Sequence, residues 1–483
     1  MQQQLKYGLF PRIIGKGDNA KRLADLLIRM RTEVTAGDAP NSGNASLLGL
    51  APSSMIDSLI IIDREVDFPT VLLTQLTYEG LIDEVFNISA NQTEVDSSVV
   101  GGAAPPTPGQ SGSASTSMKR KILIDPKDSL YSTLGDSNFA IVGNLLNKAA
   151  RRLQSSTERN QLAAKTTAEL REFVTKLPGY QAEQASLKLH TSLAEEIIKF
   201  THTDVFRRSL EVQQNVMSGL DPTTQHDTIN ELINRDVPLD QILRLLCLES
   251  TTNAGMRPKD LESFKRTIIQ AYGPQHILTL SSLEKMNLLQ PRGGSGLGAT
   301  PAAKPGSVTN YTPLRKSLKI WDDDVNEAEP NDISYTFSGY APLSVRIIQS
   351  VVQKQTLANS IKPPSDPRAA AQSNPLAQGL RIFDDACKYV RGATFDETQT
   401  GEEKAIKARS MLNGSHNDAN KTVVVFFLGG VTRAEVAALR FIGSKLKDVG
   451  GEGRGSRIMI CSTNVVKGGS LVDCAVEKGT FTA

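Results

Sequence analysis

The sequence predicts an α/β protein whose parallel sheet is built from both ends of the chain, with a mainly helical region inserted between them. Two segments carry this prediction: residues 58–86, SLIIIDREVDFPTVLLTQLTYEGLIDEVF, and residues 421–443, KTVVVFFLGGVTRAEVAALRFIG. Each is a short apolar run that stops at a turn and then opens a helix. The roughly 330 residues between them show patterns typical of helices and linkers. One sheet with an insertion is the simplest fold that fits these observations.

The composition limits the classes of function. The chain has 483 residues, enough for two or three domains, and a net charge of +2. Aromatic residues make up only 5% of it. A nucleic-acid-binding protein normally shows a dense basic face and aromatic side chains for base stacking, so the composition argues against that class.

Cysteine usage and hydropathy point to a cytosolic protein. The four cysteines lie far apart and form no CxxC pair, which argues against a zinc site or a disulfide framework. No apolar stretch reaches the roughly 18 residues that a membrane span needs. The first residues, MQQQLKYGLFPRIIGKG, contain no apolar signal core. We therefore expect any membrane association to come through a partner.

Four short apolar runs are expected to form strands. They are Leu59–Ile62, Lys121–Ile124, Val423–Leu428 and Ile458–Ile460. Unbroken apolar runs are typical of parallel strands covered on both faces. After the third run, Thr432 and Glu435 have the spacing of a capping box at a helix start.

Helices and loops are expected to fill the middle of the chain. Five segments rich in Gly, Pro, Ser, Ala and Asn bury too little apolar area to offset their ordering entropy. They are predicted to be loops: about 36–55, 97–118, 291–310, 362–378 and 397–420.

A helical hairpin is predicted over residues 258–289. Its first arm runs from about Pro258 to Ala271, the breaker Tyr272-Gly273-Pro274 turns the chain, and the second arm runs from about Gln275 to Leu289. An ordinary core hairpin and an exposed hairpin that offers a groove to another helix are about equally compatible with the apolar pattern. A polar and basic fringe favours the groove: Lys265, Arg266, Gln270, Gln275, Ser282 and Lys285.

The search for catalytic chemistry finds one candidate. Asp63 ends an apolar strand and Asp67 follows four residues later, so a magnesium-dependent phosphohydrolase could place a carboxylate there. The usual haloacid-dehalogenase-like signature needs an aspartate where this chain has Glu65. Arg64 lies next to these carboxylates, and a structural aspartate–arginine network is the favoured interpretation. No HExxH motif, triad spacing or GxSxG elbow occurs.

Two glycine motifs suggest phosphate binding only weakly. Gly15–Ala20 fits a GxGxxA pattern, but Pro11 interrupts the preceding strand and no second strand delivers a carboxylate. A plain helix start is favoured there. Gly429-Gly430 could cradle an anion, but no P-loop lysine follows, and a tight turn is favoured. A nucleotide-binding enzyme using Asp63 and Gly429-Gly430 therefore remains the alternative function.

Several segments resemble the Sec/Munc (SM) family of SNARE-binding trafficking proteins. The family's strand end followed by TPLL-TQLTYEGL-DE is similar to the segment IIIDREVDFPTVLLTQLTYEGLIDEVF. Its C-terminal GG-T-EI-ALR signature is similar to the segment VVVFFLGGVTRAEVAALRFI. ICSTNVVKGGSLVD resembles its final strand and turn, and FVTKLPGYQAEQASLKLHTSLAEEI resembles its central helical stretch. The four matches occur in the family's order.

The resemblance implies a division into domains. Residues 1–140 and 380–483 would form the two parts of an α/β domain 2. Residues 141–290 would form a helical domain 3a that carries the hairpin 258–289, and residues 291–379 would form domain 3b. The family's N-terminal domain 1 is expected to be lacking.

The resemblance also implies a function without a catalytic residue, cofactor or metal. The chain would be a SNARE-assembly chaperone for docking and fusion at the endosome and vacuole or lysosome, and a subunit of the HOPS and CORVET tethering complexes. Its implied partners are R-SNARE and Qa-SNARE helices, vacuolar protein sorting-associated protein 16 and other subunits of these complexes, with no nucleic acid. It would be cytoplasmic and peripheral on membranes. The expected SNARE contacts are the polar fringe together with Leu278.

Overall fold

A computed structural model describes most of the chain and divides it into two compact units. The described residues are 8–37, 53, 55–97, 119–125, 127–163, 167–292, 309–353, 387–398, 422–450 and 457–477. The first unit comprises Met1–Leu73, Val212–Asp323 and Gly339–Ala483, and the second comprises Thr74–Glu211 and Asp324–Ser338. The expected loops lie largely outside the described residues. The expected division into domains 2, 3a and 3b stays a prediction.

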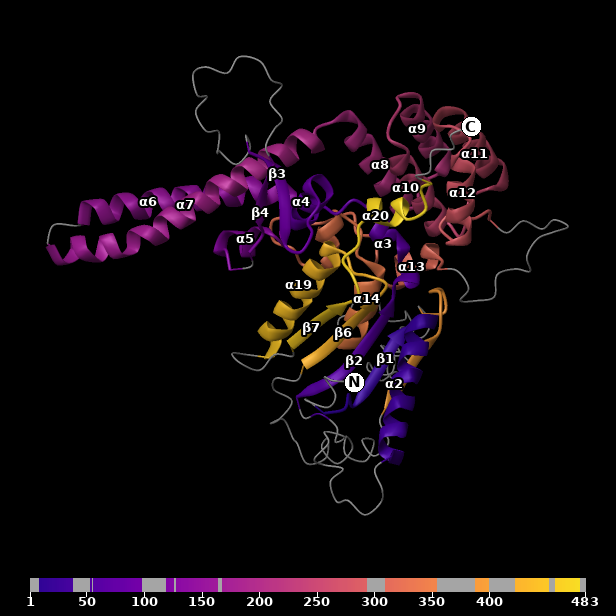
Figure 1. The fold of residues 1–483 in the computed structure, drawn as a ribbon, viewed down its shortest axis with the longest axis horizontal. Helices are drawn as coiled ribbons and strands as arrows, with labels where there is room; N and C mark the ends of the chain where they lie inside the picture. The colour runs from indigo at the N-terminus through magenta and orange to yellow at the C-terminus, as the bar shows by residue number, and fades with distance from the viewer. Residues whose placement is uncertain are drawn as a thin grey trace, which may run out of the picture. The chain divides into compact units, whose positions relative to one another are not determined.

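The first unit is built on a five-stranded sheet that joins both ends of the chain (Figure 1). Its strand order is β5-β1-β2-β6-β7. The pairs β1–β2, β2–β6 and β6–β7 are parallel, and β5 joins β1 antiparallel. The strands are β1 Arg12–Lys16, β2 Ile56–Asp63, β5 Thr394–Thr398, β6 Thr422–Leu428 and β7 Arg457–Ser462. The predicted α/β class and its predominantly parallel sheet are confirmed.

Helices cover the sheet because its strands are apolar on both faces. Helix α2, Asp18–Gly37, packs on β1 and β2, and its buried alanines Ala20 and Ala24 share a core with Ile13 and Leu59. Helix α19, Arg433–Gly450, contacts β7 and α14, Leu343–Val352. Strand β2 is buried from Ser58 to Asp63, as the unbroken apolar run predicted.

The glycine pattern after β1 serves packing. Gly17 has a φ of +114°, and a Cβ added to it would lie 2.2 Å from Cβ of Asp63. Only glycine fits such a position without a shift of the backbone. Helix α2 begins directly afterwards at Asp18, so the favoured interpretation of this motif as a plain helix start agrees with the structure.

Helix α10, Leu239–Thr252, connects several helices of the first unit. This helix contacts α3, α9 and α20, and its Arg244 donates hydrogen bonds to the carbonyl oxygens of Leu72 and Leu73 at the end of α3. The remaining elements are the 3-10 helix η1 and several helices: η1 Arg64–Val66, α3 Phe68–Leu72, α9 Pro222–Asn234, α10 Leu239–Thr252, α11 Pro258–Tyr272, α12 His276–Lys285, α13 Tyr311–Ser317 and α20 Gly468–Asp473. Helix α8, Asp204–Ser218, crosses the boundary between the units.

The predicted hairpin 258–289 is present as α11 and α12, but its second arm is shorter than expected. Helix α12 ends at Lys285, and Asn287 adopts a φ of 60° in the left-handed region. This conformation stops the helix, and Leu288 and Leu289 are buried beyond it. The predicted end at about Leu289 therefore lies beyond the true end of the helix.

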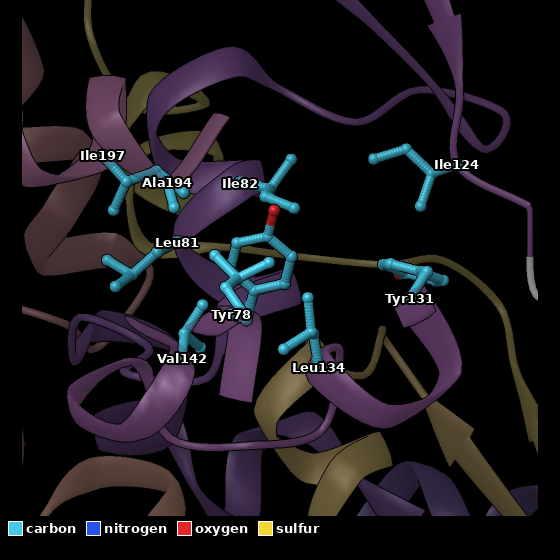
Figure 2. Packing of buried hydrophobic residues seen from close by; sticks show 10 residues of the cluster. Tyr78, Leu81, Ile82, Ile124, Tyr131, Leu134, Val142, Ala194 and Ile197 are labelled. Carbon is cyan, nitrogen blue, oxygen red and sulfur yellow. The ribbon is translucent and has the colours of Figure 1, made fainter. Parts of the chain in front are cut away.

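The second unit packs around Tyr78 (Figure 2). The Tyr78 ring lies among side chains from α4, α5, α6 and α7, including Leu81, Leu134, Val142 and Ile197. Its hydroxyl group lies 2.9 Å from Nδ1 of His190. The elements of this unit are α4 Tyr78–Phe86, β3 Gln92–Asp96, β4 Lys119–Leu123, α5 Ser129–Leu134, α6 Phe139–Ala163, α7 Thr167–Thr201 and the 3-10 helix η2 Ile333–Phe337.

The prediction that Lys121–Ile124 forms a covered parallel strand is wrong. These residues overlap β4, which pairs antiparallel with β3 in a separate two-stranded sheet. Lys119, Lys121 and Leu123 are exposed, whereas Ile122 is buried. Exposed and buried side chains alternate along this run, as in a hairpin with one face in solvent. Four residues were too few to tell such an alternating strand from an unbroken apolar one. Among the described residues, no helix is long and apolar enough to cross a membrane.

Candidate functional site

The motif at the end of β2 forms a buried charged network. The carboxylate of Asp67 accepts hydrogen bonds from the hydroxyl groups of Tyr311, at 3.0 Å, and Thr70, at 2.6 Å, and from the backbone N–H of Ser344, at 2.9 Å. All these side chains are buried. The network joins α3, α13 and the start of α14, so its first role is to hold these elements together.

Arg64 links this network to the C-terminal part of the chain. Its Nη1 lies 3.0 and 2.8 Å from the two carboxylate oxygens of Glu435, and its Nη2 donates to the carbonyl oxygen of Asp67 at 2.6 Å. Burial disfavours the guanidinium charge, but Glu435 and Asp67 outweigh this effect and raise the pKa of Arg64. The expected structural aspartate–arginine network is present, with Asp67 and Glu435 as the acidic partners.

Glu435 also closes the predicted capping box. Its carboxylate accepts from the backbone N–H of Thr432 at 2.8 Å, and the Thr432 hydroxyl accepts from the backbone N–H of Glu435 at 3.1 Å. The Ser344 hydroxyl donates a further hydrogen bond to Glu435. One carboxylate therefore caps α19 and neutralises Arg64.

Asp63 is placed for a structural role. One of its oxygens accepts from the backbone N–H of Asn19 at 3.0 Å and the other from that of Glu65 at 3.2 Å, and the residue is 3% exposed. Glu65 pairs with Arg391 at 2.7 Å. Within the described ranges, no group of three or more His, Cys, Asp or Glu side chains could hold a metal ion. This geometry gives no support to the alternative of a phosphohydrolase.

Gly429 and Gly430 form a tight turn. Their φ values are +96° and +114°, and a Cβ on Gly430 would lie 2.6 Å from Cγ1 of Val466. The turn carries the chain from β6 into the capping box of α19. A turn, rather than an anion cradle, is the role that the packing supports.

The hairpin of α11 and α12 buries its apolar face. Leu261, Phe264 and Ile268 of α11 and Leu280 and Leu283 of α12 are all buried. The core-hairpin interpretation therefore holds for this face. Any groove for another helix must be formed by the opposite, exposed face.

The expected contact residues fall into two groups. Arg266, Gln270, Leu278 and Lys285 are exposed. Lys265, Gln275 and Ser282 are only partly exposed. The Gln275 side chain donates to the carbonyl oxygen of Tyr272 at 2.9 Å, so it stabilises the turn between the arms.

Lys265 joins the two arms. Its Nζ lies 2.5 Å from Glu284 of α12 and 3.4 Å from Glu262 of its own helix. Partial burial opposes its charge, but the hydrogen bonds and charges of Glu284 and Glu262 outweigh burial and raise the pKa of Lys265. Glu284 was not predicted as the partner of Lys265, because their pairing depends on the register of the two arms.

The exposed face of the α11–α12 hairpin also holds two neighbouring apolar residues, Ile277 and Leu278. Ile277 is 53% exposed and Leu278 is 48% exposed, both in the first turn of α12. Ile277 lies three positions before the buried Leu280, so helical spacing alone would place it on the buried face. Adjacent exposed apolar side chains of this size mark a candidate contact point for a partner.

Comparisons with known proteins agree with this architecture. The Sec1 family model matches residues 1–474. Vacuolar protein sorting-associated protein 33A of Rattus norvegicus is 36% identical, over 99% of this chain and 70% of that protein. Vacuolar protein sorting-associated protein 33 of Schizosaccharomyces pombe is 31% identical, over 96% of this chain and 70% of that protein.

Solved structures show the same fold at low identity. The Unc18–syntaxin 1 complex from Monosiga brevicollis matches 97% of this chain and 68% of that chain, with a TM-score of 0.57 and 12% identity. The SM protein Vps45 in complex with the Qa SNARE Tlg2 matches 96% of this chain and 66% of that chain, with a TM-score of 0.52 and 15% identity. The family model and the relatives above 30% identity together show that this chain belongs to the Sec1 family.

Proposed function

We propose that this chain is a SNARE-binding SM protein of vacuolar and endosomal trafficking. Membership of the Sec1 family and the similarity to vacuolar protein sorting-associated protein 33 over nearly the whole chain are the observations that carry the proposal. The names of the matched SM structures, which include a Qa SNARE and syntaxin 1 as bound partners, support the same class of ligand.

The mechanism is binding and release without covalent chemistry. A segment that folds on binding spends about 2–5 kcal/mol or more of its interaction energy on ordering. A folded surface that holds one SNARE helix in register removes part of this cost before the next helix arrives. The buried network of Arg64, Asp67 and Glu435 contributes by fixing the platform, because it ties elements from distant parts of the sequence into one unit.

The exposed face of α11 and α12 is the first candidate for the SNARE contact. It presents Arg266, Gln270 and Lys285 together with the apolar pair Ile277 and Leu278. An amphipathic helix could lay apolar side chains on the pair and acidic side chains beside the cations. Lys265, Gln275 and Ser282 would act from the edge of this face, Lys265 mainly by bracing the hairpin.

A second candidate surface is the pair formed by α6 and α7. These helices contact each other and lie side by side in Figure 1, and they contain 25 and 35 residues. At a rise of about 1.5 Å per residue they offer a much longer track for a helical partner than the 10-residue α12 does. Helix α7 also carries the whole segment FVTKLPGYQAEQASLKLHTSLAEEI that resembles the family.

The wider assembly follows from the same relatives. We propose vacuolar protein sorting-associated protein 16 and other HOPS or CORVET subunits as partners, and a cytoplasmic location that is peripheral on endosome and vacuole membranes. The absence of enzymatic activity belongs to this proposal too. It is supported by the structural use of Asp63, both of whose carboxylate oxygens accept backbone hydrogen bonds.

Photo-crosslinking tests which surface holds the SNARE. A crosslinking amino acid replaces Leu278 on α12, Lys188 on α7 or Leu26 on α2, all of which are exposed, and the purified chain is mixed with an isolated R-SNARE motif. We expect adducts from position 278 and none from position 26. Adducts from position 188 alone would move the site to α6 and α7, and adducts from none of the three would contradict both surfaces.

Charge reversal provides a second readout. The double variant Arg266→Glu and Lys285→Glu is expected to weaken R-SNARE binding about tenfold, because each exposed pair is worth up to about 1 kcal/mol. Arg22→Glu on α2, also exposed, is the matched control and should leave the affinity unchanged. Lys265 is avoided, because its reversal would also repel Glu284 and loosen the hairpin. Equal binding by the double variant would remove this face from the proposal.

A further inference from the structure

A single histidine joins the base of the α11–α12 hairpin to two other helices. His226 lies in the first turns of α9, and its Nε2 is 2.8 and 2.9 Å from the two carboxylate oxygens of Glu249 on α10. Its Nδ1 is 3.9 Å from a carboxylate oxygen of Asp260 on α11. The edge of the ring also packs on Phe264 of α11, with 5.1 Å between the ring centroids.

The two carboxylates make this contact depend on a proton. A neutral imidazole has one N–H group and one lone pair, so it can donate to only one of the two acids. When its N–H group points to Glu249, its lone pair faces the carboxylate of Asp260. The protonated ring carries an N–H group on each side and a positive charge between two negative ones. Protonation therefore strengthens the connection from α9 to both α10 and α11.

The surroundings favour the charged form. Glu249 is 3% exposed, so its negative charge depends on the nearby imidazole for compensation. The other charged group that acts on the ring is Arg257, which precedes α11 and opposes protonation. Burial also opposes it, but the hydrogen bond and charge of Glu249, with the charge of Asp260, outweigh both and raise the pKa of His226.

We propose that His226 is a proton-dependent latch that fixes the α11–α12 hairpin to α9 and α10, so that the hairpin is held more firmly as the pH falls. The latch is a property of the fold and does not rest on SNARE binding. If the exposed face of the hairpin does contact a SNARE helix, the pH of the cytosol would set how rigid this contact surface is.

The direction of the effect follows from the raised pKa. A histidine whose folded-state pKa lies above its unfolded value stabilises the fold fully below about 6.5, its ordinary value. This contribution is lost as the pH rises through the higher folded-state pKa. The latch is thus closed in mildly acidic conditions and open in alkaline ones.

Amide hydrogen exchange of the full chain at pH 6 and pH 8, corrected for intrinsic exchange rates, tests the latch. In the unmodified chain, amides of α11 should be several-fold better protected at pH 6. His226→Gln, which keeps a hydrogen-bonding side chain without a titrating charge, should abolish this difference. His202→Gln, at an exposed histidine, is the matched control and should retain it.

A second variant keeps the test decisive if His226→Gln fails to fold. Asp260→Asn removes only the partly exposed second carboxylate, and it should lower the pH at which α11 loses protection. A direct titration of the His226 ring by NMR should show the same downward shift. Equal protection at both pH values in the unmodified chain, or an unshifted midpoint in Asp260→Asn, would overturn the proposal.

Discussion

At the scale of single residues, the chain uses its buried charges to hold distant segments together. Arg64 and Glu435 are separated by 371 positions and meet at 2.8 Å in the interior. Both are desolvated, so neither can lose its partner without leaving an uncompensated buried charge. The pair therefore fixes the geometry of the platform more than it adds net stability.

Neutralising one partner is expected to be costly. Glu435→Gln keeps the shape of the side chain but leaves Arg64 uncompensated and weakens the cap of α19, so the free energy of unfolding should fall by about 3 kcal/mol. Denaturant unfolding measures this change. Glu33→Gln, which breaks the exposed pair with Arg29, should cost less than about 0.5 kcal/mol. Similar losses in the two variants would show that the network does not act as a buried ion pair.

The sequence predicted part of this network. It placed Asp63, Arg64 and Asp67 together because they follow one another along the chain, and it recognised Thr432 and Glu435 from the spacing of a capping box. It could not pair Arg64 with Glu435, because that contact depends on the parallel register of β2 and β6. Tyr311, Tyr340 and Ser344 were not predicted either, although all three donate hydrogen bonds to Asp67, because they lie 244 to 277 positions further along the chain.

At the scale of elements, turns and helix ends decide where side chains point. The predicted starts of α11 and α19 agree with the structure, since proline and a capping box are strong local signals. The end of α12 and the pairing of β4 were not predicted correctly. Their determinants are the left-handed conformation of Asn287 and the partner strand β3, which no short sequence pattern reveals.

Two glycines offer a matched test of the turn after β6. Gly430→Ala should lower the free energy of unfolding by about 1 kcal/mol or more. The φ of Gly430 is positive, and the added Cβ would collide with the Val466 side chain. Gly443→Ala, within α19, should be neutral or stabilise by up to about 1 kcal/mol, because its nearest neighbour would be 4.0 Å away. Thermal unfolding compares the two. A lower unfolding temperature for Gly443→Ala than for Gly430→Ala would contradict the packing described here.

At the scale of the whole molecule, the sheet brings together three of the four segments that resemble the family, from both ends of the sequence. Strands β1 and β2 come from the first 63 residues, and β6 and β7 come from the last 62. The apolar runs predicted three strands of this sheet, β2, β6 and β7, because strands without alternation need cover on both faces. They did not predict β1 or β5, and the run Lys121–Ile124 belongs to the other sheet. The function came from the resemblance, since no catalytic or ligand pattern in the chain identifies a partner. The surface that binds a SNARE depends on which faces remain exposed after folding, and burial of the α11–α12 apolar stripe shows that periodicity does not decide this.

SNARE binding by this chain is tested by titrating the purified chain into a fluorescently labelled SNARE motif and following the anisotropy. We expect saturable binding of an R-SNARE or Qa-SNARE motif that an excess of unlabelled motif competes away, with no covalent change in either partner. If the chain unfolds cooperatively, and is therefore folded, but gives no anisotropy change with either motif, it is not a SNARE-binding protein.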